Sequence, residues 1–153
     1  MLPFDYESYG RQILEYIGEI EKQATTASAE NAKKIDFAAL RTAAEAFAKA
    51  GADLRARGDA LLGAAGSAPD ARAFADVNRR LIMAERDLIE PAGLPDRPWY
   101  RHVIYAPGLY TGYGVKTIPG VREAVDSGNT ARAAEQATLV VSALQRATRT
   151  LWP

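Results

Sequence analysis

The sequence predicts an all-α fold: an antiparallel bundle of four long helices plus one short helix, with a long ordered loop rich in proline, glycine and aromatic residues. Three observations lead to this prediction. Apolar residues recur three and four positions apart through most of the chain, which is the spacing of one helix face. No segment shows a convincing apolar and polar alternation, as a half-buried strand would. Between residues 93 and 120 the helical spacing stops. Helices joined by short connections pack as antiparallel neighbours, which favours a bundle.

The first helix is expected over residues 5–24, with Asp5 as the N-cap that accepts a hydrogen bond from a free backbone amide. Its predicted core stripe contains Tyr6, Tyr9, Ile13, Tyr16, Ile17 and Ile20. Residues 23–34 have no apolar period, so we expect a solvated connection there. The second helix starts at Asp36 and carries a seam of Phe37, Leu40, Ala44, Phe47, Gly51, Leu54, Gly58 and Leu61. Because two seam residues are glycines, a neighbouring helix is expected to approach closely at those positions.

The later helices follow the same spacing. The third is expected from about residue 69 to residue 90, with Phe74, Val77, Leu81, Ala84 and Leu88 on one face. Pro119 suits the first turn of a short helix. Asn129 or Thr130 then caps the last helix, whose seam is Ala133, Ala137, Val140, Leu144, Ala147 and Leu151.

The composition excludes several classes of function. Lysine and arginine total 19, as do aspartate and glutamate, so the net charge is zero and gives no electrostatic footprint for nucleic acid or an anionic membrane. The absence of cysteine excludes disulfides, a thiolate zinc site and a cysteine nucleophile. No run approaches the roughly 20 apolar residues of a membrane span. The apolar start, Leu2, Pro3 and Phe4, leads us to expect a piece of a longer protein.

No part of the chain assembles an active site by its spacing alone. His102 is the only histidine, and a lone histidine more often forms structural hydrogen bonds than acts as a base. Without a second histidine or a cysteine, a metal site would have carboxylates only. The acidic residues alternate with basic ones on helix faces, which is typical of a solvated surface. One alternative stays open: a free-standing helical enzyme or ligand-binding bundle that uses His102, Arg101 and the tyrosines.

The segment 93–120 still needs an explanation, because a loop of this length within a small domain tends to be functional or covered by a partner. Its prolines fix backbone angles, and its aromatic rings need burial. Arg97 and Arg101 offer forked donors that can tie loop carbonyls or carboxylates together. We expect a loop with a fixed shape that covers another surface.

The sequence "LIEPAGLPDRPWYRHVIYAPG" followed by "YGVKTIPGVREAVD" resembles one family closely. That family is the C-terminal helical domain of glutamate carboxypeptidase II-like proteins, also called the transferrin receptor-like dimerisation domain. At the other end, "LPFDYESYGRQILEYI" is similar to the segment that follows the peptidase domain in this family. The resemblance covers nearly the whole chain and is weakest over residues 25–73.

The resemblance implies that residues 1–153 form one such domain of a larger peptidase, which mediates homodimerisation. It implies that a separate peptidase domain holds two zinc ions and the catalytic glutamate. This chain would then carry no metal and no catalytic residue, and would be inactive alone, with a homodimer and the peptidase domain as partners and no contact with nucleic acid or membrane. The family also contains non-enzymatic receptors, so a receptor-like scaffold stays a further alternative. Family members usually work outside the cytoplasm, so we expect a periplasmic or secreted parent.

The resemblance also implies site residues. In this family the long loop folds over the peptidase domain and helps line the substrate cavity, where a Lys-Tyr pair contacts a terminal glutamate. The expected pocket residues here are Tyr110, Gly112, Tyr113 and Lys116; the tyrosine of the pair matches Tyr113, and Gly112 stands where the lysine is expected. The residues expected to shape the loop are Arg97, Tyr100, Arg101, His102 and Tyr105.

Overall fold

A computed structural model of the chain describes residues 2–63, 71–109 and 114–152. These residues are mostly helical: α1 is Tyr6–Ala27, α2 Ala29–Ala32, α3 Phe37–Gly63, α4 Ala71–Asp87, α5 Pro119–Asp126 and α6 Thr130–Leu151. Two short strands, β1 (Tyr105–Pro107) and β2 (Val115–Thr117), form an antiparallel sheet. The prediction of a mostly helical chain is confirmed. The sequence predicts no strand, and this sheet shows that the prediction is wrong there. Strands of three residues are too short to show an alternation of apolar and polar residues.

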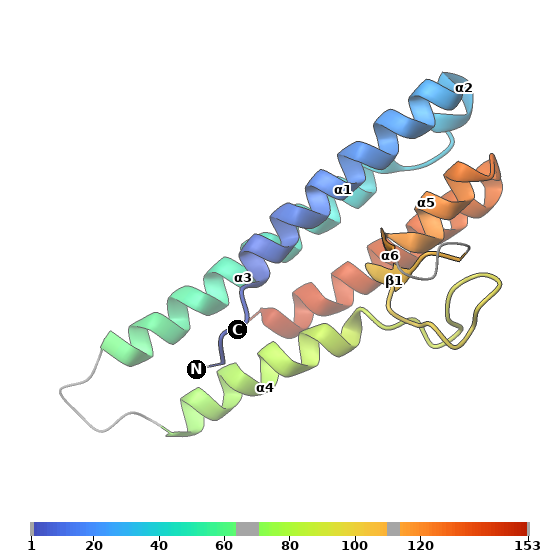
Figure 1. The fold of residues 1–153 in the computed structure, drawn as a ribbon. Helices are drawn as coiled ribbons and strands as arrows, with labels where there is room; N and C mark the ends of the chain where they lie inside the picture. The colour runs from blue at the N-terminus through green and yellow to red at the C-terminus, as the bar shows by residue number, and fades with distance from the viewer. Residues whose placement is uncertain (1, 64–70, 110–113, 153) are drawn as a thin grey trace.

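The helices pack through the predicted seams. Figure 1 shows α1 along the first part of α3 and α4 beside α6, and α3 and α5 also pack on α6. The Phe47, Leu54 and Leu144 side chains are fully buried between them. All six predicted seam residues of the last helix are buried. Burial of these apolar faces contributes the largest favourable free energy of folding.

The close helix approach predicted at the seam glycines is confirmed at Gly51. A Cβ built on Gly51 would lie 2.7 Å from the backbone nitrogen of Glu7 on α1. Gly58 is also buried in α3. Glycine therefore lets the backbones of α1 and α3 approach more closely than a side chain would allow.

The expected connection over residues 23–34 is instead largely helical. α1 continues to Ala27, and α2 follows after Ser28, whose side chain accepts from the backbone N–H of Asn31 at 3.3 Å. The buried residues in this range are Ala24 and Ala32, too widely spaced to show a helical period in the sequence. A serine cap between two helices therefore turns the chain without a long loop.

α4 ends at Asp87, three residues before the expected end. Arg146 of α6 donates to the backbone carbonyls of Asp87 at 3.1 Å and Ile89 at 3.4 Å. In the other direction, Arg80 of α4 donates to the backbone carbonyl of Thr150 at 3.3 Å, in the last turn of α6. Each arginine thereby satisfies carbonyls that the end of the neighbouring helix leaves free.

Within the described residues, no helix combines the length and apolar character needed to cross a membrane.

Candidate functional site

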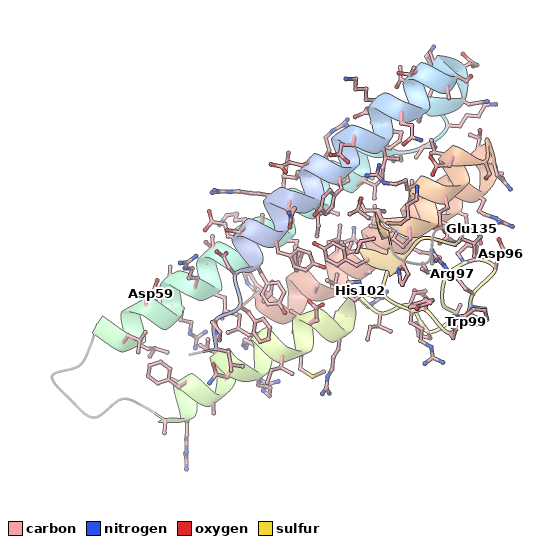
Figure 2. All side chains as sticks on the ribbon, in the orientation of Figure 1. Asp59, Asp96, Arg97, Trp99, His102 and Glu135 are labelled. Atoms are coloured by element: carbon pink, nitrogen blue, oxygen red, sulfur yellow. The ribbon has the colours of Figure 1, made fainter. Side chains whose placement is uncertain are left out.

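The chain between α4 and α5 first forms a small closed loop beside the bundle. Two backbone hydrogen bonds join its ends. The N–H of Glu90 donates to the Arg101 carbonyl at 2.8 Å, and the N–H of Val103 donates to the Leu88 carbonyl at 3.0 Å. Inside these pairs, Leu94 donates to the Tyr100 carbonyl at 2.7 Å. Figure 2 shows Arg97 and Trp99 on this part of the chain, which Arg132 of the long helix α6 contacts through an ion pair with Asp96 at 2.9 Å. Backbone hydrogen bonds therefore define the shape of residues 88–103 without a long regular element.

The hairpin of β1 and β2 follows directly. Tyr105 is opposite Thr117, and Pro107 is opposite Val115. The pairing continues on both sides: Gly108 donates to the Gly114 carbonyl, and Ile118 donates to the Ile104 carbonyl, each at 2.8 Å. The predicted pocket residues Tyr110, Gly112 and Tyr113 lie outside the described residues, between the two strands.

Arg97 connects the small loop, the hairpin and α5. Its side chain is only 3% exposed. The guanidinium donates to the Pro107 carbonyl and, at 2.7 Å, to the Glu123 carboxylate. The same carboxylate accepts from the backbone N–H of Leu109 at 3.2 Å. The Arg97 guanidinium also lies 5.7 Å from the centre of the Tyr100 ring. Three segments that are separate in sequence therefore meet at one buried ion pair.

α5 holds the second strand of the hairpin as well. Lys116, one of the predicted pocket residues, donates to Asp126 at 3.0 Å and is about one-third exposed. Arg122 donates to the backbone carbonyl of Thr117 at 3.2 Å and to its hydroxyl at 2.8 Å. The sequence prediction did not include these α5 residues, because charges on a short helix look the same whether they face solvent or a neighbouring strand.

His102 uses both ring nitrogens. Its Nδ1 accepts from the backbone N–H groups of Ile104 and Tyr105, each at 3.2 Å. Because Nδ1 is an acceptor, the ring proton sits on Nε2, which lies 3.1 Å from a carboxylate oxygen of Glu85 on α4. No ring nitrogen is left free to act as a base toward a substrate. This geometry disfavours an independent active site built on His102.

Tyr105 faces α1. Its ring stacks on that of Tyr9, with centroids 5.7 Å apart and planes within 5°. The Tyr16 ring meets it edge-on at 6.2 Å. Burial is the largest cause that raises the pKa of Tyr105 and of Tyr9 above the ordinary value of about 10. Tyr9, Glu85 and Tyr105 also line a groove that is too open to enclose a ligand.

The remaining predicted loop residues are more exposed. Tyr100 is 39% exposed, and the Arg101 side chain is exposed without a hydrogen bond or ion pair to any described residue. The contact that Arg101 makes within the loop is through its backbone carbonyl. Trp99 directly precedes Tyr100 and is 72% exposed. These exposed side chains therefore form a surface on which another part of a protein can pack.

Residues 2–63, 71–109 and 114–152 bring together no three histidine, cysteine, aspartate or glutamate side chains that could hold a metal ion. Zinc is bound by three or four such ligands. The described residues therefore do not fit a zinc site, and no step of a zinc-dependent reaction can be placed on them.

Comparison with known proteins gives a consistent picture. Residues 35–152 match the model of the transferrin receptor-like dimerisation domain. The chain is 32% identical over 127 residues to a probable glutamate carboxypeptidase, LAMP1, of Arabidopsis thaliana, which covers 83% of this chain and 17% of that protein. It is 33% identical over 138 residues to a probable glutamate carboxypeptidase of Arthroderma benhamiae, with coverage of 88% and 18%.

A third relative, the aminopeptidase NAALADL1 of Mus musculus, is 30% identical over 160 residues, which cover 99% of this chain and 20% of that protein. The chain therefore spans about a fifth of the length of the relatives that it matches.

Proposed function

Because the chain belongs to the transferrin receptor-like dimerisation domain family, we propose that it is the dimerisation and substrate-pocket-completing module of a glutamate carboxypeptidase II-like zinc metallopeptidase. In this proposal residues 1–153 form one domain, an antiparallel bundle of the four long helices with an ordered loop, which is catalytically inactive alone. Two zinc ions and the catalytic groups belong to a separate peptidase domain of the parent protein. The peptidase names of the relatives support this assignment.

The observation that carries the pocket role is the anchored hairpin. The residues on both sides of 110–113 are held by backbone pairing and by ion pairs to α5. A frame of this kind fixes the points at which the chain leaves the first strand and enters the second. With the family resemblance, this anchored hairpin supports Tyr110, Gly112, Tyr113 and Lys116 as the proposed pocket residues.

The proposed pocket differs from a glutamate-specific one at Gly112. Glycine offers no charge for a terminal carboxylate, and Lys116 already pairs with Asp126. We expect the parent enzyme to show a weaker preference for peptides that end in glutamate. Steady-state hydrolysis of acetylated dipeptides with glutamate, methionine or leucine at the C-terminus measures this preference. A strict requirement for glutamate would contradict the proposed pocket.

A two-fold homodimer is the proposed assembly. Several apolar side chains are exposed on the domain surface, among them Ile82 and Met83 on α4 and Ile89 just beyond it. Light scattering at micromolar concentration should give about twice the chain mass of 16.5 kDa. A mass of one chain at every concentration would count against dimerisation by this domain alone.

The parent is proposed to act outside the cytoplasm, which cell fractionation of the producing organism can test. The alternative of a non-catalytic scaffold makes a different prediction for the parent. A purified parent that lacks stoichiometric zinc and hydrolyses no peptide would favour the scaffold over the peptidase.

A further inference from the structure

We infer that Glu123 on α5 is a positioning residue for the pocket segment, an inference that rests on the proposed function. Glu123 is not part of the hairpin but of the helix that follows it. One oxygen of its carboxylate accepts from the Arg97 guanidinium at 2.7 Å and from the backbone N–H of Leu109 at 3.2 Å. Leu109 directly precedes residues 110–113. Glu123 therefore fixes the chain at the point where the proposed pocket residues begin.

Because the ion pair between Arg97 and Glu123 is largely buried, it favours a single arrangement of the loop and α5. The Arg97 side chain is 3% exposed and that of Glu123 is 20% exposed. Water screens such a pair much less than a surface pair. A buried arginine left without its carboxylate is costly, so arrangements in which Glu123 turns away from Arg97 are disfavoured. The Arg97 guanidinium also donates to Pro107, which extends the anchor to the end of β1.

α5 is fixed in turn to the long helices. A Cβ built on Gly120 would collide with the side-chain oxygen of Gln136, so α5 sits directly on α6. Arg122 donates to Glu19 of α1 at 2.9 Å. Through Lys116 and Asp126, the return strand is held to the same helix. Both flanks of the hairpin are therefore set relative to one short helix that is docked on the bundle.

This geometry predicts a specific kinetic effect. In the proposed parent, the groups that cleave the bond lie in another domain, so a displaced hairpin does not change them. It changes how well the pocket contacts the substrate. Loss of Glu123 should therefore raise KM about tenfold and leave kcat within about twofold, since displacements near 1 Å at a site cost up to about a hundredfold.

The experiment uses the full-length polypeptide that carries this domain, with the substitutions Glu123→Ala, Glu123→Gln and Glu135→Ala. Glu135 is the matched control, because it is exposed on α6 and its side chain forms no hydrogen bond or ion pair with a described residue. The first measurement is hydrogen exchange at the backbone amides of residues 105–106, 108–109 and 114–117. The second is KM and kcat for the acetylated dipeptides above, and a thermal melt of each variant checks folding.

The expected result for Glu123→Ala is faster exchange at Leu109 and in both strands, by about tenfold or more, together with the rise in KM. Glu123→Gln keeps an oxygen acceptor and should retain part of the protection, and Glu135→Ala should behave as the unsubstituted protein. If Glu123→Ala does not fold, the exchange and KM of Glu123→Gln decide.

Unchanged exchange at the hairpin in a folded Glu123 variant overturns the positioning role, whatever the activity. Faster exchange with an unchanged KM has a different meaning: Glu123 then holds the hairpin, but the hairpin does not complete the pocket, and the proposed function is overturned together with the role inferred from it. A fall in kcat at constant KM also overturns the inference, because it would place the effect on the chemical step.

Discussion

Gly10 of α1 lies directly against Ala48 of α3. A Cβ built on Gly10 would come within 2.6 Å of the Ala48 Cβ and 2.8 Å of its Cα. The contact at Gly51 repeats this relationship in the other direction, toward Tyr6 and Glu7. Reciprocal approaches of this kind fix how far apart the two helices lie, and with it the position of the aromatic side chains between them.

We therefore predict that Gly10→Ala destabilises the domain by about 1–3 kcal/mol, because the added methyl group has no room and the helices must separate. Gly18→Ala on the same helix is the matched control. A Cβ at Gly18 meets nothing within 4 Å, so the substitution should stabilise the helix by up to about 1 kcal/mol. Urea unfolding measures both changes. Equal effects of the two substitutions would mean that α1 and α3 do not pack as closely as described.

Tyr6 and Tyr9 form a second matched pair, because one hydroxyl is satisfied and the other is not. The Tyr6 hydroxyl donates to the Leu81 carbonyl of α4 at 2.6 Å. The Tyr9 hydroxyl is buried and has no hydrogen-bond partner among the described residues. Tyr6→Phe should cost about 0.5–1.5 kcal/mol, whereas Tyr9→Phe should be neutral or stabilise the fold by up to about 1 kcal/mol. Chemical unfolding of both variants tests this, and a larger cost for Tyr9→Phe would contradict it.

The same tyrosines predict a loss of stability at alkaline pH. Burial is the largest cause that raises the pKa of Tyr6 and of Tyr9, and the nearby charge of Glu85 adds to it. Their folded pKa values thus lie above the unfolded value of about 10. The stability linked to the neutral hydroxyls is fully present below pH about 10 and is lost as pH rises above it, because only the unfolded chain then releases the protons.

In that window each of these tyrosines should lower the free energy of unfolding by about 1.4 kcal/mol per pH unit. Urea unfolding between pH about 8 and about 11 measures the slope. Tyr6→Phe removes one titrating group and should make the slope less steep. A free energy of unfolding that stays constant up to pH about 11 would contradict the burial of these hydroxyls.

The helix seams could be predicted from the sequence because burial imposes a period that is visible in the order of residues. Ala133, Val140 and Leu144 are three or four positions apart, and their side chains must face one direction in a helix. Asn129 could be predicted as a cap, and it accepts from the backbone N–H of Arg132 at 3.1 Å. These features depend on residues that are close together in the chain.

The anchors of the candidate site could not be predicted in this way. Arg97 and Glu123 are 26 positions apart, and nothing in their local sequence distinguishes a buried pair from two solvated charges. Ile118 is another example: it adopts a left-handed backbone with φ of 46°, which is rare for a β-branched residue. Its side chain is fully buried and its N–H pairs with Ile104, so long-range contacts hold a conformation that local preference disfavours.

Phe47 joins these features, since it lies where α1 and α3 approach and where the two tyrosines meet the core. Its side chain is fully buried, with ring centroids 5.5 Å from Tyr6 and 6.0 Å from Tyr9. Phe47→Ala should cost about 3–5 kcal/mol, because the cavity has rigid walls where the helix backbones are already in contact. Phe4, whose ring also stacks on Tyr6 but is 45% exposed, is the control, and Phe4→Ala should cost less than about 1 kcal/mol. A loss below about 1 kcal/mol for Phe47→Ala in urea unfolding would mean that the core can close around the missing ring, which the contact between Gly10 and Ala48 should prevent.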